Sequence, residues 1–199
     1  MRSLELDGCM SVKQLTSAKV NRLAFTVPLA LAVIVVGFNS PSLRSQQQNT
    51  ELVWVVKSNR GTIAVIDPAT DSIIDLIDPR WGVTGDAIAI ADGAVWVSYL
   101  SSWVHRIDPV TREVVATMET QTYNGGIAVG GGSVWVGNGD DSRLTRIVPG
   151  TNQVAGGVET EYAVYDVATT DNSVWAATTQ GQIERFAPSA ASATNIIKD

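Results

Sequence analysis

The chain has 199 residues, of which 45% are hydrophobic and 17% are charged. This composition excludes a disordered chain, which would combine low hydrophobicity with high charge, and the glycines lack the triplet period of collagen. Because 14 Lys and Arg residues stand against 20 Asp and Glu residues, the net charge is −6. A general nucleic-acid binder needs clustered cations, so we expect no nucleic-acid partner.

An uncharged apolar stretch occupies residues 23–38 (LAFTVPLALAVIVVGF). Cationic side chains precede it and a polar stretch follows it, which is the layout of a secretory signal. It is shorter than the about 20 apolar residues that span a bilayer, which favours a cleaved signal over an uncleaved anchor. Val35 and Gly37 are small enough for the cleavage site.

We therefore predict an N-terminal hydrophobic helix within residues 1–38, acting as a signal peptide or a signal anchor, and a polar linker over 39–50. This segment would engage the membrane or the export machinery. The rest of the chain would then be periplasmic, extracellular or held at the membrane by one N-terminal span. The only cysteine, Cys9, precedes the apolar stretch, so the exported part contains no disulfide.

A repeat of about forty residues fills the remainder of the chain. A tryptophan recurs at intervals of 42, 39 and 40 residues in the phrases VWVV, VWVS, VWVG and VWAA, and a proline recurs at intervals of 41, 40 and 39. The tryptophans are Trp54, Trp96, Trp135 and Trp175. The prolines are Pro68, Pro109, Pro149 and Pro188.

Each unit divides into short strands at turn residues such as Asp92-Gly93 and Asp108-Pro109. The strands of the first copy are predicted at 52–56, 62–66 and 72–77, and those of the second at 87–90, 95–98, 104–107 and 113–118. The third copy has 127–129, 134–137, 144–147 and 153–158, and the last has 166–168, 174–177, 183–186 and 194–197. The first copy lacks a first strand, because the polar stretch before it is not typical of a strand.

Stacked four-stranded antiparallel units of this length are the blades of a β-propeller. We predict an all-β fold of about four blades, at 51–79, 80–120, 121–160 and 161–199, forming a tight, partial or open ring. The repeated tryptophans are predicted to pack between blades. The repeated arginines are predicted to pack their stems along the blades and to pair with acids; they are Arg106, Arg146 and Arg185.

The phrases GIAVGGGSVWVGN and IDPxT resemble the YVTN-repeat propellers and the related virginiamycin B lyase-like and quinoprotein amine dehydrogenase-like propellers. The tetrad 135–138 (WVGN) stands where the YVTN tetrad would stand, and the resemblance covers residues 51–199. The lyase resemblance implies a histidine base and a divalent metal near the propeller axis. The only histidine, His105, aligns with Ala64, Thr145 and Glu184 in the other copies, so the lyase activity is not carried over.

The quinoprotein resemblance implies at most an electron-transfer or scaffold role. The sequence contains no Cys and His cluster for a redox centre, and we expect no cofactor. Asp140 and Asp141 with Asn138 offer too few oxygens for Ca²⁺, so we interpret them as a solvated turn and expect no metal.

Aromatic residues outside the repeat gather in the links from strand 2 to strand 3 and from strand 4 to the next blade. These links share one face of a propeller, whereas the turns of the opposite face carry no aromatic residue. Aromatic residues with polar tips are common at binding surfaces, although they could also plug gaps between blades. The predicted ligand-binding residues are Trp81, Tyr99, Trp103, Tyr123, Asn124, Tyr162, Tyr165, Arg60 and Arg80.

Three functions are compatible with these patterns. The first is a non-enzymatic, exported or membrane-anchored propeller that binds a ligand or protein through the aromatic face, and we predict no catalytic residue. The second is a metal-dependent propeller lyase or lactonase-like hydrolase, with Asp86, Asp166 and Asn124 as candidate ligands. The third is an incomplete propeller, whose uncovered blade faces would favour a homo-oligomer.

Overall fold

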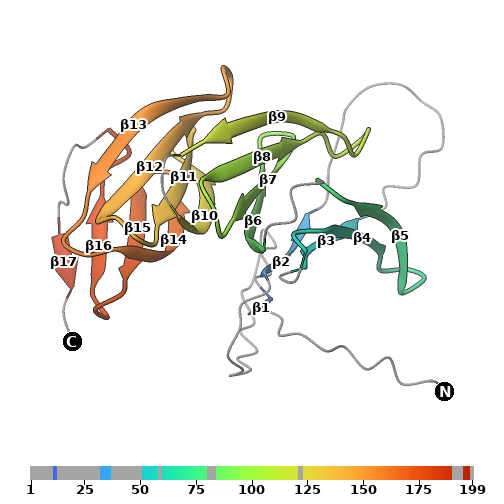
Figure 1. Ribbon diagram of the computed structural model, residues 1–199, viewed down its shortest axis with the longest axis horizontal. Coiled ribbons are helices and arrows are strands. Elements are labelled where there is room, and N and C mark those ends of the chain that lie inside the picture. The colour runs from blue at the N-terminus through green and yellow to red at the C-terminus, as the bar shows by residue number, and fades with distance from the viewer. Residues whose placement is uncertain are drawn as a thin grey trace.

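The computed structural model describes residues 11–12, 32–36, 51–57, 60–79, 84–120, 123–189 and 195–197. All regular structure in these ranges is β-strand, arranged as successive sheets in which each strand pairs with the next along the chain (Figure 1). No helix in the described ranges has the length and apolarity needed to cross a bilayer. The all-β prediction is confirmed.

The first sheet differs from the prediction at its N-terminal edge. It contains β1 (Ser11–Val12), β2 (Ala32–Val36), β3 (Leu52–Val56), β4 (Ile63–Asp67) and β5 (Ser72–Ile77). The stretch Ala32–Val36, expected within a helix, is instead a strand antiparallel to β3 and supplies the strand that the first repeat lacked. Its sequence AVIVV is rich in β-branched residues, which favour strands. The rest of the predicted helix and linker lies outside the described residues, apart from the short β1.

The next three sheets match the repeat, and every strand predicted there is confirmed with small shifts at its ends. The second blade contains β6 (Gly85–Ala91), β7 (Ala94–Tyr99), β8 (Trp103–Ile107) and β9 (Val114–Glu119). The third contains β10 (Asn124–Gly130), β11 (Ser133–Asn138), β12 (Arg143–Val148) and β13 (Gln153–Glu159). The fourth contains β14 (Val164–Thr170), β15 (Ser173–Thr178), β16 (Ile183–Phe186) and β17 (Asn195–Ile197). We refer to β2–β5 as the first blade.

Two kinds of tight turn join the strands at one end of the second blade. Asp92 and Gly93 both have positive φ, at 52° and 70°, which suits the twist of a two-residue hairpin. In the turn between β8 and β9, the Asp108 carboxylate accepts hydrogen bonds from the backbone N–H groups of Val110 and Thr111, at 2.7 and 2.9 Å. These bonds favour the ionised carboxylate and lower the pKa of Asp108.

The two faces of each blade have different roles, because alternate residues of a strand point to opposite sides. The Trp face carries the repeated tryptophan, and the Val face carries its neighbours on the second strand. Trp54, Trp96 and Trp135 are 1%, 0% and 0% exposed, as expected for residues packed between blades. Trp54 and Trp96 lie in the main core cluster, and Trp135 packs in a second cluster with residues of the fourth blade such as Val164 and Val174.

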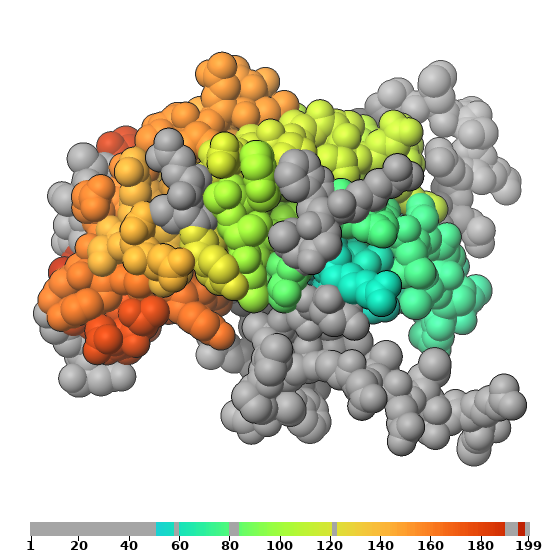
Figure 2. Space-filling view, viewed as in Figure 1, coloured from blue at the N-terminus to red at the C-terminus, as the bar shows by residue number. Residues whose placement is uncertain are grey.

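The blades form an open series. The inner strands β2, β6, β10 and β14 lie next to one another in this order, whereas the first and fourth blades lie at opposite ends of the molecule (Figure 1). Figure 2 shows the same order at the surface, from the teal first blade to the orange-red fourth blade. The described blades are therefore propeller-like, but they do not close into a ring.

Candidate functional site

The loop rim is the end of the blades that carries the predicted ligand-binding residues. Backbone hydrogen bonds tie each link between blades to the loop between the second and third strands. Leu100 N–H donates to Thr84 O at 2.9 Å, Gly139 N–H to Tyr123 O at 2.8 Å, and Thr179 N–H to Ala163 O at 2.9 Å. The same bond in three blades gives the rim a fixed backbone on which side chains can be presented.

The predicted aromatic residues fall into different environments on this rim. Tyr165 and Tyr123 are exposed, at 67% and 44%, whereas Trp103 and Tyr162 are half-buried. Arg60 is also exposed, and Arg80 and Trp81 lie outside the described residues. The surface that a ligand can reach is thus carried by the two tyrosines, and Tyr165 sits at a register shift between Val164 and Asp166 that turns it outward.

Asn124, another predicted ligand-binding residue, is 1% exposed and uses its side chain inside the protein. Its Oδ1 accepts a hydrogen bond from the Thr120 hydroxyl at 2.6 Å, and its Nδ2 donates to Trp103 O at 3.0 Å. The Thr120 backbone N–H in turn donates to Ser102 O at 2.7 Å. Asn124 therefore fixes the link between the second and third blades, a role that its position in a link did not reveal.

Tyr99 is also buried, and it contacts the chain's only histidine. The ring centroids of Tyr99 and His105 are 4.9 Å apart, and both residues are 0% exposed. Burial lowers the pKa of His105 to about 4, so the imidazole is neutral at pH 7. Burial, reinforced by the negative charge of Asp78, raises the pKa of the Tyr99 hydroxyl, which stays protonated. The Tyr99 hydroxyl has no hydrogen-bond partner among the described residues.

The Tyr99 and His105 pair is one member of a series that the sequence did not reveal. At the equivalent place on the third blade, the Thr145 hydroxyl donates to Asn138 Oδ1 at 2.9 Å. On the fourth blade, Glu184 is 1% exposed and accepts a hydrogen bond from Glu161 N–H at 2.8 Å. The signal for this position in the sequence is a polar residue within an otherwise apolar third strand. The residue recurs in each of these blades, and in each it is buried.

The cavities beside these residues are small. One of about 40 Å³ lies at the loop end of the third blade, among Asn138, Arg143, Thr145 and Thr120. That volume accommodates little more than a water molecule. Within the described ranges, no three His, Cys, Asp or Glu side chains come together as metal ligands. Asp140 and Asp141 are exposed in a turn.

The repeated arginines lie over the repeated tryptophans, at 5.4, 5.8 and 5.3 Å from guanidinium carbon to ring centroid. The pairs are Arg106 with Trp96, Arg146 with Trp135, and Arg185 with Trp175. Packing of the stems along the blade is therefore confirmed. Arg146 Nε donates to the Ser133 hydroxyl at 2.7 Å and Arg185 Nε to the Ser173 hydroxyl at 2.9 Å.

No protein-family profile matches the chain, and no curated protein is detectably similar to it in sequence. Solved structures resemble it in fold. Hydrazine synthase from Kuenenia stuttgartiensis has a TM-score of 0.64 at 14% identity, covering 73% of this chain and 45% of its own. Glutaminyl cyclase from Myxococcus xanthus has a TM-score of 0.55 at 9% identity, covering 73% of this chain and 65% of its own.

Both neighbours are β-propeller-type folds, so the chain shares that fold. It spans less than two thirds of either neighbour. At these identities the likeness concerns the fold and carries no site from one protein to the other.

Proposed function

We propose that this protein is a binding propeller that holds a ligand or protein partner on its loop rim. The observation that supports this function is the placement of Tyr123 and Tyr165, two exposed tyrosines on a rim whose loops are tied by repeated backbone hydrogen bonds. The turns that the structure describes at the opposite end contain no aromatic residue. Tyrosine suits a binding surface because it offers a rigid apolar ring and a polar tip at low entropic cost.

The ligand class that fits this rim is a neutral sugar or an unstructured peptide. Such ligands stack on tyrosine rings and hydrogen bond to their hydroxyls, and they do not require the deep apolar pocket of a small drug-like ligand. Arg60 adds one exposed cation to the rim of an acidic protein. A partner with a local carboxylate would therefore be favoured over a polyanion.

A Tyr123→Ala and Tyr165→Ala double variant tests this proposal. We would titrate the protein with a panel of neutral oligosaccharides and unstructured peptides and follow tyrosine and tryptophan fluorescence. The double variant should lose binding and keep the same melting temperature, because both side chains are exposed. Val110→Ala is the matched control, since Val110 is 85% exposed at the opposite end. Equal binding by the double variant, or no binding by the intact chain, would contradict the proposal.

An enzymatic function has less support from the geometry. The only histidine would have to serve as the base, but its pKa of about 4 makes it a weak base at pH 7, and it is fully buried. Adding Ca²⁺, Mg²⁺ or EDTA while recording thermal unfolding would test the metal-dependent alternative. A metal-dependent rise in melting temperature would favour that enzyme over the binding propeller.

We also propose that the protein is exported, on the basis of the apolar stretch 23–38 and the cations before it. Strand β2 lies within this stretch, so cleavage after Gly37 would remove the first blade's inner strand while leaving β3–β17. Cell fractionation followed by N-terminal sequencing of the mature chain tests both points. Recovery of the intact chain in the cytoplasm would contradict export.

A further inference from the structure

Contacts between consecutive blades bury the Trp face of one blade against the Val face of the next. Trp96 of the second blade shares the main core cluster with Val134 and Val136 of the third. Trp135 of the third blade shares the second cluster with Val174 and Ala176 of the fourth. Each contact therefore joins a large aromatic side chain to small apolar side chains on the second strand of the following blade.

The Trp face carries further apolar residues on its third and fourth strands, and the second and third blades bury them. On the third strand these residues are Val104 and Leu144, both 0% exposed. Their partners on the fourth strand are Met118 and Val158, which are 4% and 3% exposed. In these two blades the whole apolar part of the Trp face lies under the next blade or its links.

In the fourth blade the same positions are apolar but open. Ile183 and its partner Ile197 are 43% and 45% exposed, Ala177 is exposed and Trp175 is half-buried. Trp175 and Ile183 line a mostly apolar hollow of about 180 Å³ together with Ala168. An aromatic and aliphatic surface of this kind on a regular sheet is typical of an interaction surface.

Small side chains beside the tryptophan let the next blade approach closely. Ser98 of the second blade donates through its hydroxyl to Gly125 O of the third at 3.1 Å. The third blade has Gly137 at this position, against Val164 of the fourth. The fourth blade has Ala177 there, so its face leaves room for the inner strand of another blade.

The first blade does not supply the cover for this face. The first and fourth blades lie at opposite ends of the molecule (Figure 1). Val55 of the first blade is equivalent to Val136 and Ala176, but it is already 4% exposed, and its neighbour Ala64 is 3% exposed. The described part of the first blade therefore has no open place for a tryptophan at Val55, in the same chain or in a second copy.

We propose that the Trp face of the fourth blade binds a partner polypeptide through the Val face of a propeller blade in that partner. The interface continues the established series of blade contacts and covers Trp175, Ile183 and Ile197 as the equivalent residues of the third blade are covered. The partner presents a four-stranded antiparallel sheet with valine or alanine two residues apart on one face of its second strand. This inference does not depend on ligand binding at the loop rim.

The probe for this surface is a blade of the same repeat joined to the full chain. A copy of residues 122–159 appended after Asp199 gives a link of the same length as residues 160–163, between β13 and β14. The copied Val134 and Val136 are residues that already cover Trp96. Trp135→Phe in the appended copy leaves Trp175 as the reporter, and hydroxyl-radical labelling followed by mass spectrometry measures its exposure.

Labelling of Trp175 should fall to the rate seen for Trp135 of the original third blade. The melting temperature should rise by at least about 4 °C, because contacts between neighbouring repeats add stability. The matched control carries Val134→Lys and Val136→Lys in the appended blade alone, and it should leave Trp175 labelled as in the unextended chain. A second extension, with a copy of residues 162–199 that carries Trp175→Phe, covers the case in which the first added blade fails to fold.

Strong labelling of Trp175 in both extended chains would overturn the proposal, as would protection that survives the two lysines. Protection of Trp175 in the unextended monomer would also overturn it, because the chain would then cover its own face. A second copy as the occupant would be shown by protection that appears in the unextended chain as its mass doubles from 21.2 kDa with rising concentration, and this result would equally overturn the proposal.

Discussion

The third and fourth blades have nearly the same repeat but different surroundings. Trp135 and Trp175 each lie under an arginine, yet the first is fully buried and the second is half-buried. Gly137 lies against Val164 of the following blade, whereas the equivalent Ala177 is exposed. The burial of a repeat residue is therefore decided by the neighbouring blade. The repeat sequence gives each blade an apolar face. The place of the blade in the series decides whether a neighbouring blade covers that face.

The largest expected loss of stability follows from replacing Trp135, and replacing Trp175 provides the comparison. Trp135→Ala should lower the free energy of unfolding by about 3–5 kcal/mol, because it leaves a cavity in the packed contact between the third and fourth blades. Trp175→Ala should cost no more than about 1 kcal/mol in the monomer, because its ring is already partly in water. Urea denaturation at low protein concentration measures both changes. Similar losses in the two variants would show that the fourth blade is as well covered as the third.

A second contrast concerns the buried polar position, which is His105 in the second blade and Thr145 in the third. The pKa of His105 is lowered to about 4 by burial, so the unfolded chain takes up a proton near pH 6.5 before the folded chain does. Stability should therefore be full above pH 6.5 and should fall by about 1–3 kcal/mol between pH 6.5 and pH 4.

Unfolding measured across this pH range in the intact protein and in His105→Thr tests that contribution. The variant copies the residue of the third blade and should remove this part of the pH dependence, leaving only the titration of carboxylates. An unchanged profile in the variant would show that His105 does not titrate differently in the folded and unfolded states.

Gly137 and Ala177 each lie two residues after a repeated tryptophan, and exchanging their residue types compares a packed site with an exposed one. A Cβ at Gly137 would lie 2.8 Å from Val164 Cγ1 and 3.1 Å from Val164 O. Gly137→Ala should therefore destabilise the protein by about 1–3 kcal/mol through overpacking of the contact between the third and fourth blades. Ala177→Gly should cost about 1 kcal/mol or less, because it changes only backbone freedom at an exposed site. Equal effects in thermal unfolding would contradict the difference in packing.

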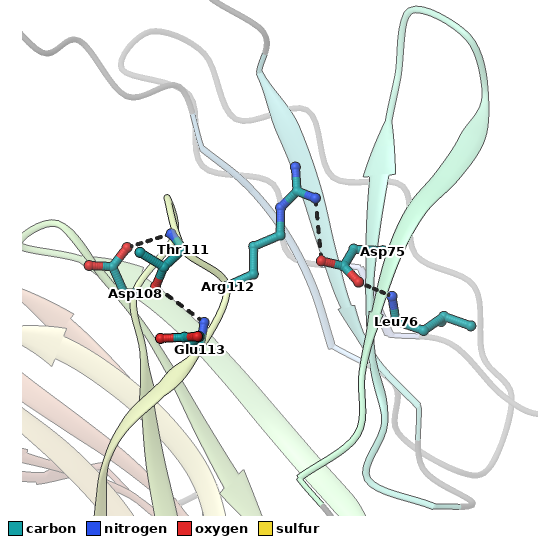
Figure 3. A network of polar contacts seen from close by, with 6 residues as sticks. All are labelled: Asp75, Leu76, Asp108, Thr111, Arg112 and Glu113. Carbon is teal, nitrogen blue, oxygen red and sulfur yellow. Dashed lines mark hydrogen bonds and ion pairs between the residues drawn. The ribbon is translucent and has the colours of Figure 1, made fainter.

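The smallest effect is expected for the charged pair between Arg112 and Asp75, whose side chains are 30% and 38% exposed. Asp75→Asn removes the charge but keeps an oxygen that can accept the hydrogen bond from Leu76 N–H (Figure 3). The loss of stability should be about 0.2–1 kcal/mol and should diminish in high salt. A larger loss that does not depend on salt would indicate that the pair fixes the position of the first blade.

The repeat predicted most of the fold, because alternating apolar residues and Asp-Gly or Asp-Pro turns are local signals. It did not predict β2, since the run AVIVV satisfies the requirements of an apolar helix and of a strand equally well, and only pairing with β3 distinguishes them. The order of the blades followed from their sequence order. The opening between the fourth and first blades depends on long-range packing, which no local pattern encodes.

The candidate site was less predictable. The sequence placed tyrosines on one rim, and the structure shows Tyr123 and Tyr165 exposed there, but Tyr99 is buried against His105. Side-chain direction at a strand end depends on the register of the pair, so residue type alone could not separate exposed from buried tyrosines. Asn124 was chosen as a polar residue in a link, and the structure uses both of its polar atoms to hold that link.

No described blade covers the Trp face of the fourth blade, where Trp175 is half-buried. Hydroxyl-radical labelling followed by mass spectrometry measures the exposure of Trp175 directly, at a protein concentration at which light scattering shows a monomer. The predicted result is strong labelling of Trp175 and little labelling of Trp54, Trp96 and Trp135, which are at most 1% exposed. Protection of Trp175 equal to that of Trp135 in the monomer would show that the Trp face of the fourth blade is covered.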